Sequence, residues 1–196
     1  DYNSLANITD GLFIMGYNYH WSGSGSAGPV SPLGGFYYDL EYTVDDYLYY
    51  TNNNSEKLIL GLPYFGYDWP VENDIMYSFT TGIASSRTYS SVRELASIHS
   101  YVWDESSNSQ WIPYFNDQWR QCWYDDSLSL SEKYIFANDR QLSGIGIWAL
   151  GYDDGFEDLW GALEAQFSGC ESTGDVNLDG SLDILDIIMM IANILE

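Results

Sequence analysis

The feature that most constrains the fold is a short apolar run, Ile145–Leu150, broken by small residues. A run of this length is typical of a strand buried on both faces, as in a parallel sheet. Gly144 and Gly146 remove side chains where neighbouring elements must approach closely. Trp148 allows two interpretations, because the interiors of eight-stranded barrels are filled mainly by Val, Ile and Leu. It is either a core residue or an aromatic floor at the mouth of a barrel.

Three segments resemble, in chain order, the last three strands of a known barrel family. Phe13–Asn18 reads Phe-Ile-Met-Gly-Tyr-Asn, and Lys57–Tyr67 reads Lys-Leu-Ile-Leu-Gly-Leu-Pro-Tyr-Phe-Gly-Tyr. The third segment, Gly144–Tyr152, reads Gly-Ile-Gly-Ile-Trp-Ala-Leu-Gly-Tyr. They are similar to the sixth, seventh and eighth strands of the chitinase-like family 18 glycoside hydrolases. The resemblance covers Asp1 to about Gln166 and implies part of a (β/α)8 TIM barrel.

The length of the chain limits how much of such a barrel it can form. A (β/α)8 barrel usually needs about 250 residues, and this chain has 196. We therefore expect an α/β fold in which residues 1–169 form the C-terminal part of the barrel, and we interpret the chain as a fragment. Apolar periodicity predicts helices over residues 40–52, 127–138 and 155–167.

Residues 68–126, approximately, do not alternate regularly between strands and helices. A helix-like stretch near residues 90–100 is followed by two short aromatic segments, Trp111–Phe115 and Trp119–Tyr124. This pattern predicts a small α+β insertion. The resemblance places it after the seventh strand, where many chitinases carry an insertion that walls one side of the cleft. Four tryptophans here are either core residues or cleft aromatics: Trp103, Trp111, Trp119 and Trp123.

The charge of the chain excludes several classes of partner. It has 29 acidic and 6 basic residues, and its formal net charge is −23. Such a chain repels nucleic acids and anionic membranes, so neither is expected as a partner. No apolar run reaches membrane-spanning length, and no signal peptide is visible. The resemblance to secreted glycosidases nevertheless implies an extracellular location.

The composition changes at Gly169–Gly174, and an acidic loop follows. Its spacing matches a twelve-residue calcium loop, with glycine at the sharp turn at Gly180. The alternative is a solvated acidic turn. The candidate ligands are Asp175, Asn177, Asp179, Ser181, Asp183 and Asp186.

Position 12 of this loop is Asp186 rather than Glu, and no helix precedes the loop. Both features resemble a dockerin repeat, so residues 170–196 are expected to be a linker and a single dockerin-type repeat with structural calcium. A complete dockerin has two repeats and binds a cohesin. The segment after the loop is apolar on most sides and needs a covering partner. A cohesin-like protein, a second repeat or the barrel part itself could supply it.

The resemblance also implies a reaction. Family 18 enzymes retain configuration by a substrate-assisted route, in which the N-acetyl group of the substrate attacks the anomeric carbon. The proton donor ends an Asp-x-x-Asp-x-Asp-x-Glu motif on the fourth strand, and this motif does not occur in the chain. We therefore assign no catalytic residue. By resemblance, Met15, Tyr17 and Asn18 hold the N-acetyl group and Trp148 stacks against the sugar. Asn18 replaces the usual Asp of the family.

Two functions follow from these assignments. In the first, the parent protein is a secreted chitinase-like hydrolase of N-acetylglucosamine-containing polysaccharide, and this chain alone is inactive. In the second, it is a non-catalytic carbohydrate-binding relative on the same barrel. An Asp-x-Asp-x-Glu sequence upstream would favour the enzyme.

The remaining reactive residues suggest no further site. Cys122 and Cys170 are either a disulfide, as in secreted proteins, or two buried thiols. His20 and His99 stand alone without zinc-ligand spacing. Asp68, Asp153 and Asp154 are expected to be solvated carboxylates rather than a general-acid pair.

Overall fold

The chain contains a three-stranded parallel sheet in the order β1-β2-β8. The computed structural model describes residues 1–167, so the predicted calcium loop and Cys170 lie outside the described residues. The strands are β1 (Leu12–Met15), β2 (Leu58–Pro63) and β8 (Gly144–Trp148). Both pairings are parallel. The three motif segments thus form adjacent parallel strands, which confirms the α/β prediction for this part.

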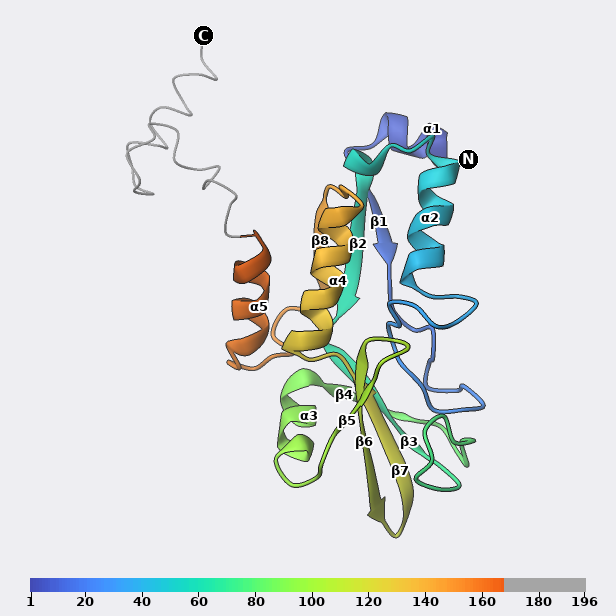
Figure 1. Cartoon of the computed structure of the whole chain (residues 1–196), viewed down its shortest axis with the longest axis vertical. Coiled ribbons are helices and arrows are strands. Elements are labelled where there is room, and N and C mark those ends of the chain that lie inside the picture. Colours follow the sequence, from blue (N-terminus) through green and yellow to red (C-terminus); the bar gives the residue numbers. More distant parts are fainter. Residues whose placement is uncertain (168–196) are drawn as a thin grey trace, which may run out of the picture.

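Helices accompany these strands: one precedes β1, one follows β8, and the two between them connect the strands and cover one face of the sheet (Figure 1). They are α1 (Tyr2–Ile8), α2 (Leu40–Tyr50), α4 (Ser127–Asp139) and α5 (Asp158–Phe167). Parallel strands need such crossovers, because the chain must return to the same end of the sheet. Side chains of Asp39 and Asp126 cap α2 and α4. Within residues 1–167, no helix is long and apolar enough to span a membrane.

The two faces of the parallel sheet differ in exposure. Leu58, Leu60 and Leu62 point to the helices and are fully buried. The opposite face is open, where Met15 is 70% exposed and Trp148 is 51% exposed. The prediction that the Trp148 strand is buried on both faces is therefore wrong. Helices pack on one face alone, and β8 pairs only with β2 among the described residues.

The free edge of β8 borders an apolar groove of about 540 Å³ between this strand and α5. Its lining includes residues 143–147 and, from α5, Trp160, Leu163 and Phe167. Both odd and even positions of β8 contribute, so the groove follows the strand edge rather than one face. The groove extends as far as Leu150, just past the carboxyl end of β8.

A second sheet is inserted directly after β2. It is antiparallel, in the order β4-β3-β7-β6-β5, and lies beyond the carboxyl ends of the parallel strands (Figure 1). Its strands are β3 (Phe65–Pro70), β4 (Ser85–Thr88), β5 (Val102–Asp104), β6 (Ser109–Asn116) and β7 (Gln118–Tyr124). The helix α3 (Tyr89–Ala96) follows β4. The antiparallel sheet starts at Phe65, before the expected position near 68.

Large aromatic side chains form the core of the insertion. Trp69 and Trp123 are fully buried, and Trp111 is 4% exposed. The rings of Trp111 and Trp123 stack with centroids 5.3 Å apart and an interplanar angle of 10°. Trp103 and Trp119 are half-buried. Of the alternatives left open for the four tryptophans, Trp111 and Trp123 are therefore core residues.

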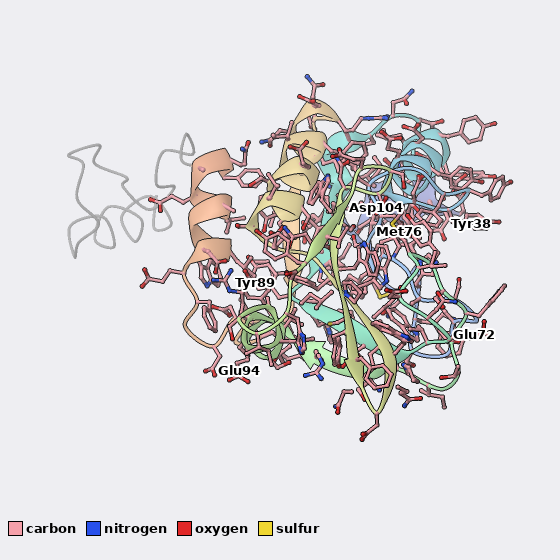
Figure 2. The ribbon with its side chains drawn as sticks, turned by 60° about the horizontal axis from the view of Figure 1, so that its bottom comes forward. Tyr38, Glu72, Met76, Tyr89, Glu94 and Asp104 are labelled. Carbon is pink, nitrogen blue, oxygen red and sulfur yellow. The ribbon has the colours of Figure 1, made fainter. Side chains whose placement is uncertain are left out.

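A hydrogen bond and an ion pair attach the insertion to α5. The Tyr89 hydroxyl, at the start of α3, donates to Asp158 Oδ2 at 2.5 Å. Figure 2 shows Tyr89 beside α3, on the side that faces α5. Arg93, one turn later, pairs with the same carboxylate at 3.3 Å. Tyr152 packs against the cores of both parts of the chain.

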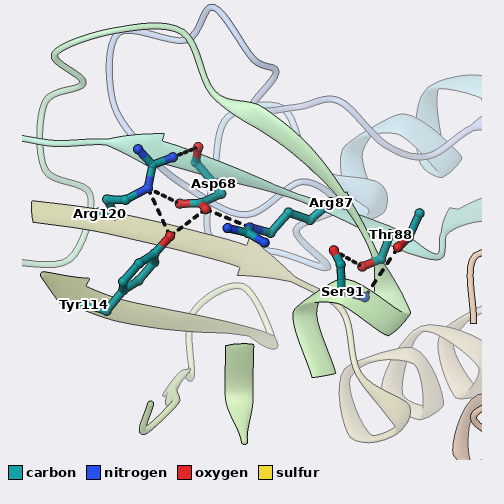
Figure 3. Close-up of polar contacts among 6 residues, drawn as sticks. All are labelled: Asp68, Arg87, Thr88, Ser91, Tyr114 and Arg120. Carbon is teal, nitrogen blue, oxygen red and sulfur yellow. Dashed lines mark hydrogen bonds and ion pairs between the residues drawn. The ribbon is translucent and has the colours of Figure 1, made fainter. Parts of the chain in front are cut away.

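Asp68 holds four strands of the insertion together (Figure 3). Its carboxylate accepts hydrogen bonds from Arg87 Nε at 2.7 Å, Arg120 Nε at 2.9 Å and the Tyr114 hydroxyl at 2.6 Å. The side chain is fully buried. The expectation of a solvated carboxylate is wrong for Asp68, because two guanidinium groups and a phenol replace water around it.

Cys122 is fully buried in β7, and burial raises the pKa of its thiol. Its expected partner, Cys170, lies outside the described residues. The choice between a disulfide and two buried thiols stays a prediction.

Candidate active site

The predicted sugar-binding residues lie at the carboxyl ends of the parallel strands. Trp148 is the last residue of β8, opposite Pro63, and Met15 is the last residue of β1, opposite Gly61. Tyr17 follows β1, and its ring centroid lies 6.4 Å from that of Trp148, at an interplanar angle of 31°. The structure thus brings Tyr17 and Trp148 together at one end of the open face. Met15 is on the same face.

Trp148 is displayed by a fixed strand end. Its carbonyl accepts a hydrogen bond of 2.7 Å from the Tyr64 backbone N–H, and the strand pairs with β2 along its whole length. Half of the side chain remains exposed. An exposed indole on a rigid backbone offers a flat apolar surface for a ring-shaped ligand.

Asn18 faces a tyrosine of the insertion. Its backbone is left-handed, with φ of 67°, a conformation that Asn adopts more readily than most residues. The Tyr67 hydroxyl, from β3, donates to Asn18 Oδ1 at 3.1 Å. The insertion therefore contributes a side chain to the candidate site, through the contact between Tyr67 and Asn18.

Both tyrosines of the site are suited to donate hydrogen bonds. Burial raises the pKa of Tyr17 and of Tyr67 above the ordinary phenol value. Each hydroxyl is therefore protonated at neutral pH. Tyr17 is also held by the Phe65 ring, with centroids 5.8 Å apart.

Phe13 is a second aromatic residue of the open face. It is 47% exposed, and its ring lies over two glycines. A Cβ added at Gly61 or at Gly146 would lie 2.2 Å from a Phe13 ring carbon. These glycines therefore make room for the ring, which is the close approach expected of Gly146. Phe13 was not among the predicted site residues.

Tyr67 was also missed by the sequence analysis. It lies in the third position of β3 and belongs to the quoted motif of the seventh strand. The motif therefore contained Tyr67, but its role in the site could be recognised only from the position of β3 beside the site.

The carboxylates near Trp148 are not arranged as a general-acid pair. Asp153 is 7% exposed and accepts a hydrogen bond from Trp160 Nε1 at 2.8 Å. The expectation that it is solvated is wrong, because α5 packs over it. Asp154 is exposed. Of these two carboxylates, one is therefore buried against Trp160 and the other is exposed to solvent.

The histidines do not form a metal site in the described part of the chain. His20 Nδ1 lies 3.0 Å from the Pro29 carbonyl oxygen, and burial lowers the pKa of His20. The ring of His99 contacts that of Tyr114. Residues 1–167 contain no group of three or more His, Cys, Asp or Glu side chains able to hold a metal ion.

A family comparison gives the classification of the chain. The model of glycosyl hydrolases family 18 matches residues 1–153, which include all three parallel strands and the insertion. The chain belongs to glycosyl hydrolase family 18. The match confirms the resemblance seen in the strand motifs.

Curated relatives are similar over most of the chain but are much longer. The cortical fragment-lytic enzyme of Bacillus subtilis is 26% identical over 179 residues, which cover 88% of this chain and 38% of the relative. The di-N-acetylchitobiase of Mus musculus is 27% identical over 195 residues, which cover 84% of this chain and 51% of the relative. The family 18 chain thus spans between about a third and a half of these relatives.

Solved structures of this family share the fold. A family 18 chitinase from Cycas revoluta, in complex with (GlcNAc)3, matches with a TM-score of 0.75 and 21% identity, over 83% of this chain and 48% of that one. A chitinase-like agglutinin from Robinia pseudoacacia matches with a TM-score of 0.71 and 22% identity, over 84% of this chain and 49% of that one. At these identities the likeness concerns the fold.

Proposed function

We propose that the parent protein is a glycoside hydrolase acting on N-acetylglucosamine-containing polysaccharide, and that this chain supplies one wall of its sugar site. The observation that supports the proposal is the half-exposed Trp148 beside Tyr17 at the carboxyl ends of the strands. In barrels of this type, active sites lie at that end. Relatives of the family also include enzymes named for chitobiose and cortical fragments.

The chemistry assigned to this wall is positioning. The sugar stacks its apolar C–H face on Trp148, and the protonated Tyr17 hydroxyl donates to the N-acetyl carbonyl oxygen. That oxygen then forms a bond to the anomeric carbon while the glycosidic C–O bond breaks. The departing oxygen takes a proton from a carboxylic acid outside these 196 residues. Water later opens the cyclic intermediate and restores the N-acetyl group, giving retention.

Asn18 distinguishes this site from the usual family pattern. An amide is neutral, so it contributes hydrogen bonds without the negative charge of the family's Asp. Its Oδ1 is held by Tyr67, which leaves the NH2 group to face a ligand acceptor. A neutral group at this position stabilises developing positive charge less than a carboxylate does.

That difference favours a second candidate function, a non-catalytic carbohydrate-binding protein. A family 18 fold also occurs in the chitinase-like agglutinin. Turnover of a fluorogenic N-acetylglucosamine oligomer by the full-length parent separates the two candidates. Binding without turnover would assign the second.

Binding by the chain itself tests the site. We expect (GlcNAc)3 to bind the 196-residue chain, and Trp148→Ala to weaken it about tenfold, or about 1.4 kcal/mol. The matched control is Phe115→Ala, which removes an aromatic side chain that is 61% exposed at another surface. Equal affinities of the two variants, measured by calorimetry, would move the sugar site away from Trp148.

We also propose that the tail binds one structural calcium ion through the oxygens of its acidic loop, and that the parent is secreted and attached to a cohesin-like partner. The support is the ligand spacing between Asp175 and Asp186. Calorimetric titration of the whole chain should show one calcium site, lost in Asp179→Ala and retained in Asp74→Ala. No calcium heat at millimolar concentration would refute this.

A further inference from the structure

Exposed tyrosines gather on the outer side of helix α2 and on the loop before it. Tyr37 is 76% exposed, Tyr38 62%, Tyr42 43%, Tyr49 74% and Tyr50 53%. We call these five residues the tyrosine surface. Figure 2 shows Tyr38 at the outer margin of the molecule, on the opposite side from Tyr89. Contiguous exposed aromatic side chains of this kind mark binding surfaces.

The rings of Tyr37, Tyr38 and Tyr42 hold one another in place, while those of Tyr49 and Tyr50 form a separate pair with centroids 5.1 Å apart. Tyr37 and Tyr42 are close to parallel, with centroids 5.7 Å apart and an interplanar angle of 30°. Tyr38 stands across both, at 82° to Tyr37 and 83° to Tyr42. Tyrosine has few rotatable bonds, and these contacts restrict them further. A ligand therefore meets a preorganised platform, and little ordering entropy opposes binding.

The helix below these rings is firmly attached to the core. Leu40 and Val44 are fully buried, and the Asp39 carboxylate accepts a hydrogen bond from the Tyr42 backbone N–H at 2.8 Å. Tyr42 and Tyr50 are eight positions apart, so the surface extends about 12 Å along the axis. The outer face of a surface helix is ordinarily charged or polar. Packing of the core therefore does not account for these tyrosines.

The charges around the rings indicate the class of partner. Glu41, Asp45 and Asp46 lie on the same helix, and the chain carries a net charge of −23. This excludes polyanions such as nucleic acids. The cores of protein interfaces are depleted of such carboxylates. A tyrosine combines an apolar ring face with a hydroxyl, which suits a sugar chain that presents apolar C–H faces and hydroxyl groups.

We propose that the tyrosine surface binds polysaccharide outside the candidate site, so that a long chain is held by the protein at two places. The ligand class, a polymer containing N-acetylglucosamine, rests on the proposed function. The surface itself does not require catalysis. It acts by raising the time that the protein spends on an insoluble polymer.

The test compares polymer with short oligosaccharide, using the whole 196-residue chain. Depletion onto chitin powder and onto purified peptidoglycan measures polymer binding, and calorimetry with (GlcNAc)3 measures the candidate site. The triple variant Tyr37→Ser, Tyr38→Ser, Tyr42→Ser should weaken binding to one of these polymers about tenfold or more and leave (GlcNAc)3 affinity unchanged. The matched control replaces three other exposed side chains, Ile98→Ser, Tyr101→Ser and Phe115→Ser, and should bind like the unaltered chain.

The outcomes separate this inference from the proposed function. If (GlcNAc)3 binds independently of Trp148 while polymer binding still requires the tyrosines, the candidate site fails and the tyrosine surface stands. Unchanged polymer binding by the tyrosine variant overturns the inference, as does failure of the unaltered chain to bind either polymer. A change in sedimentation of the tyrosine variant without a change in polymer binding would identify the surface as a contact between copies, which also overturns it.

Discussion

The insertion and the parallel sheet use aromatic and charged side chains in opposite ways. In the insertion, Trp111 and Trp123 stack on each other inside the core, and Asp68 is surrounded by its own partners. In the parallel part, Trp148 and Phe13 point to an open face. The difference shows that residue type alone does not identify a site. Side chains whose contacts are satisfied within the fold support it, whereas those left exposed on a rigid strand are available to a ligand.

The contrast between the two regions predicts that the chain alone does not catalyse hydrolysis. We expect no turnover of a fluorogenic N-acetylglucosamine oligomer, because the motif that supplies the catalytic carboxylic acid in this family does not occur in the chain. General acid catalysis contributes about 10²–10⁴-fold. A chain joined to its upstream half should be active. Turnover by the chain alone, above that of Trp148→Ala, would mean that a carboxylate within residues 1–167 acts as the acid.

Removing the central carboxylate of the insertion should reduce stability without changing the site chemistry. Asp68→Ala leaves Arg87 and Arg120 without their shared partner, and breaking a buried pair costs about 3 kcal/mol. The lower end of the range applies because the two arginine side chains are 30% and 17% exposed. Urea unfolding measures the loss, with the exposed Asp74→Ala as control. If Asp68→Ala and the unaltered chain unfold at the same urea concentration, Asp68 does not stabilise the insertion.

Tyr67 belongs to the insertion but contacts Asn18 of the candidate site, so its hydroxyl tests whether the insertion contributes to sugar binding. Tyr67→Phe removes the hydrogen bond to Asn18 and should reduce (GlcNAc)3 affinity by about 1 kcal/mol, or roughly fivefold. Tyr101→Phe, at an exposed position, is the matched control. Calorimetry at neutral pH measures the change in affinity. An unchanged affinity would show that Asn18 is positioned without help from the insertion.

The smallest expected effect concerns pH. Burial opposes the charge of Asp104, but hydrogen bonds from Ser107, Tyr77 and Ser106 outweigh it, so its pKa is lowered. A lowered pKa in the folded state stabilises the fold above the ordinary carboxyl value of about 3.9, and this stabilisation is lost as the pH falls through the lowered value. Asp104→Asn should therefore unfold at a lower urea concentration than the unaltered chain at pH 6. The difference between the two urea midpoints should become smaller toward pH 3. A difference that does not change with pH would contradict the lowered pKa of Asp104.

The order of elements was predictable because it depends on local signals. The strand motifs and the apolar periodicity of the helices are properties of short segments. The exposure of the Trp148 strand was not predictable, because it depends on which distant elements cover each face. The pairing of Asp68 with Arg120 joins residues 52 positions apart. The contact between Tyr67 and Asn18 joins residues 49 positions apart, and no pattern within a short segment predicts such a contact.

The link between Tyr89 and Asp158 has a mechanical consequence. Asp158 opens α5, the last described helix, and receives both Tyr89 and Arg93 from the insertion. A tether fixed to residues beyond Phe167 pulls on α5 first. Its load passes along residues 149–157 into β8, which carries Trp148, and through Asp158 into α3 of the insertion. Tension at the tail would therefore act on both parts of the sugar site at once, the strand that carries Trp148 and the insertion that supplies Tyr67.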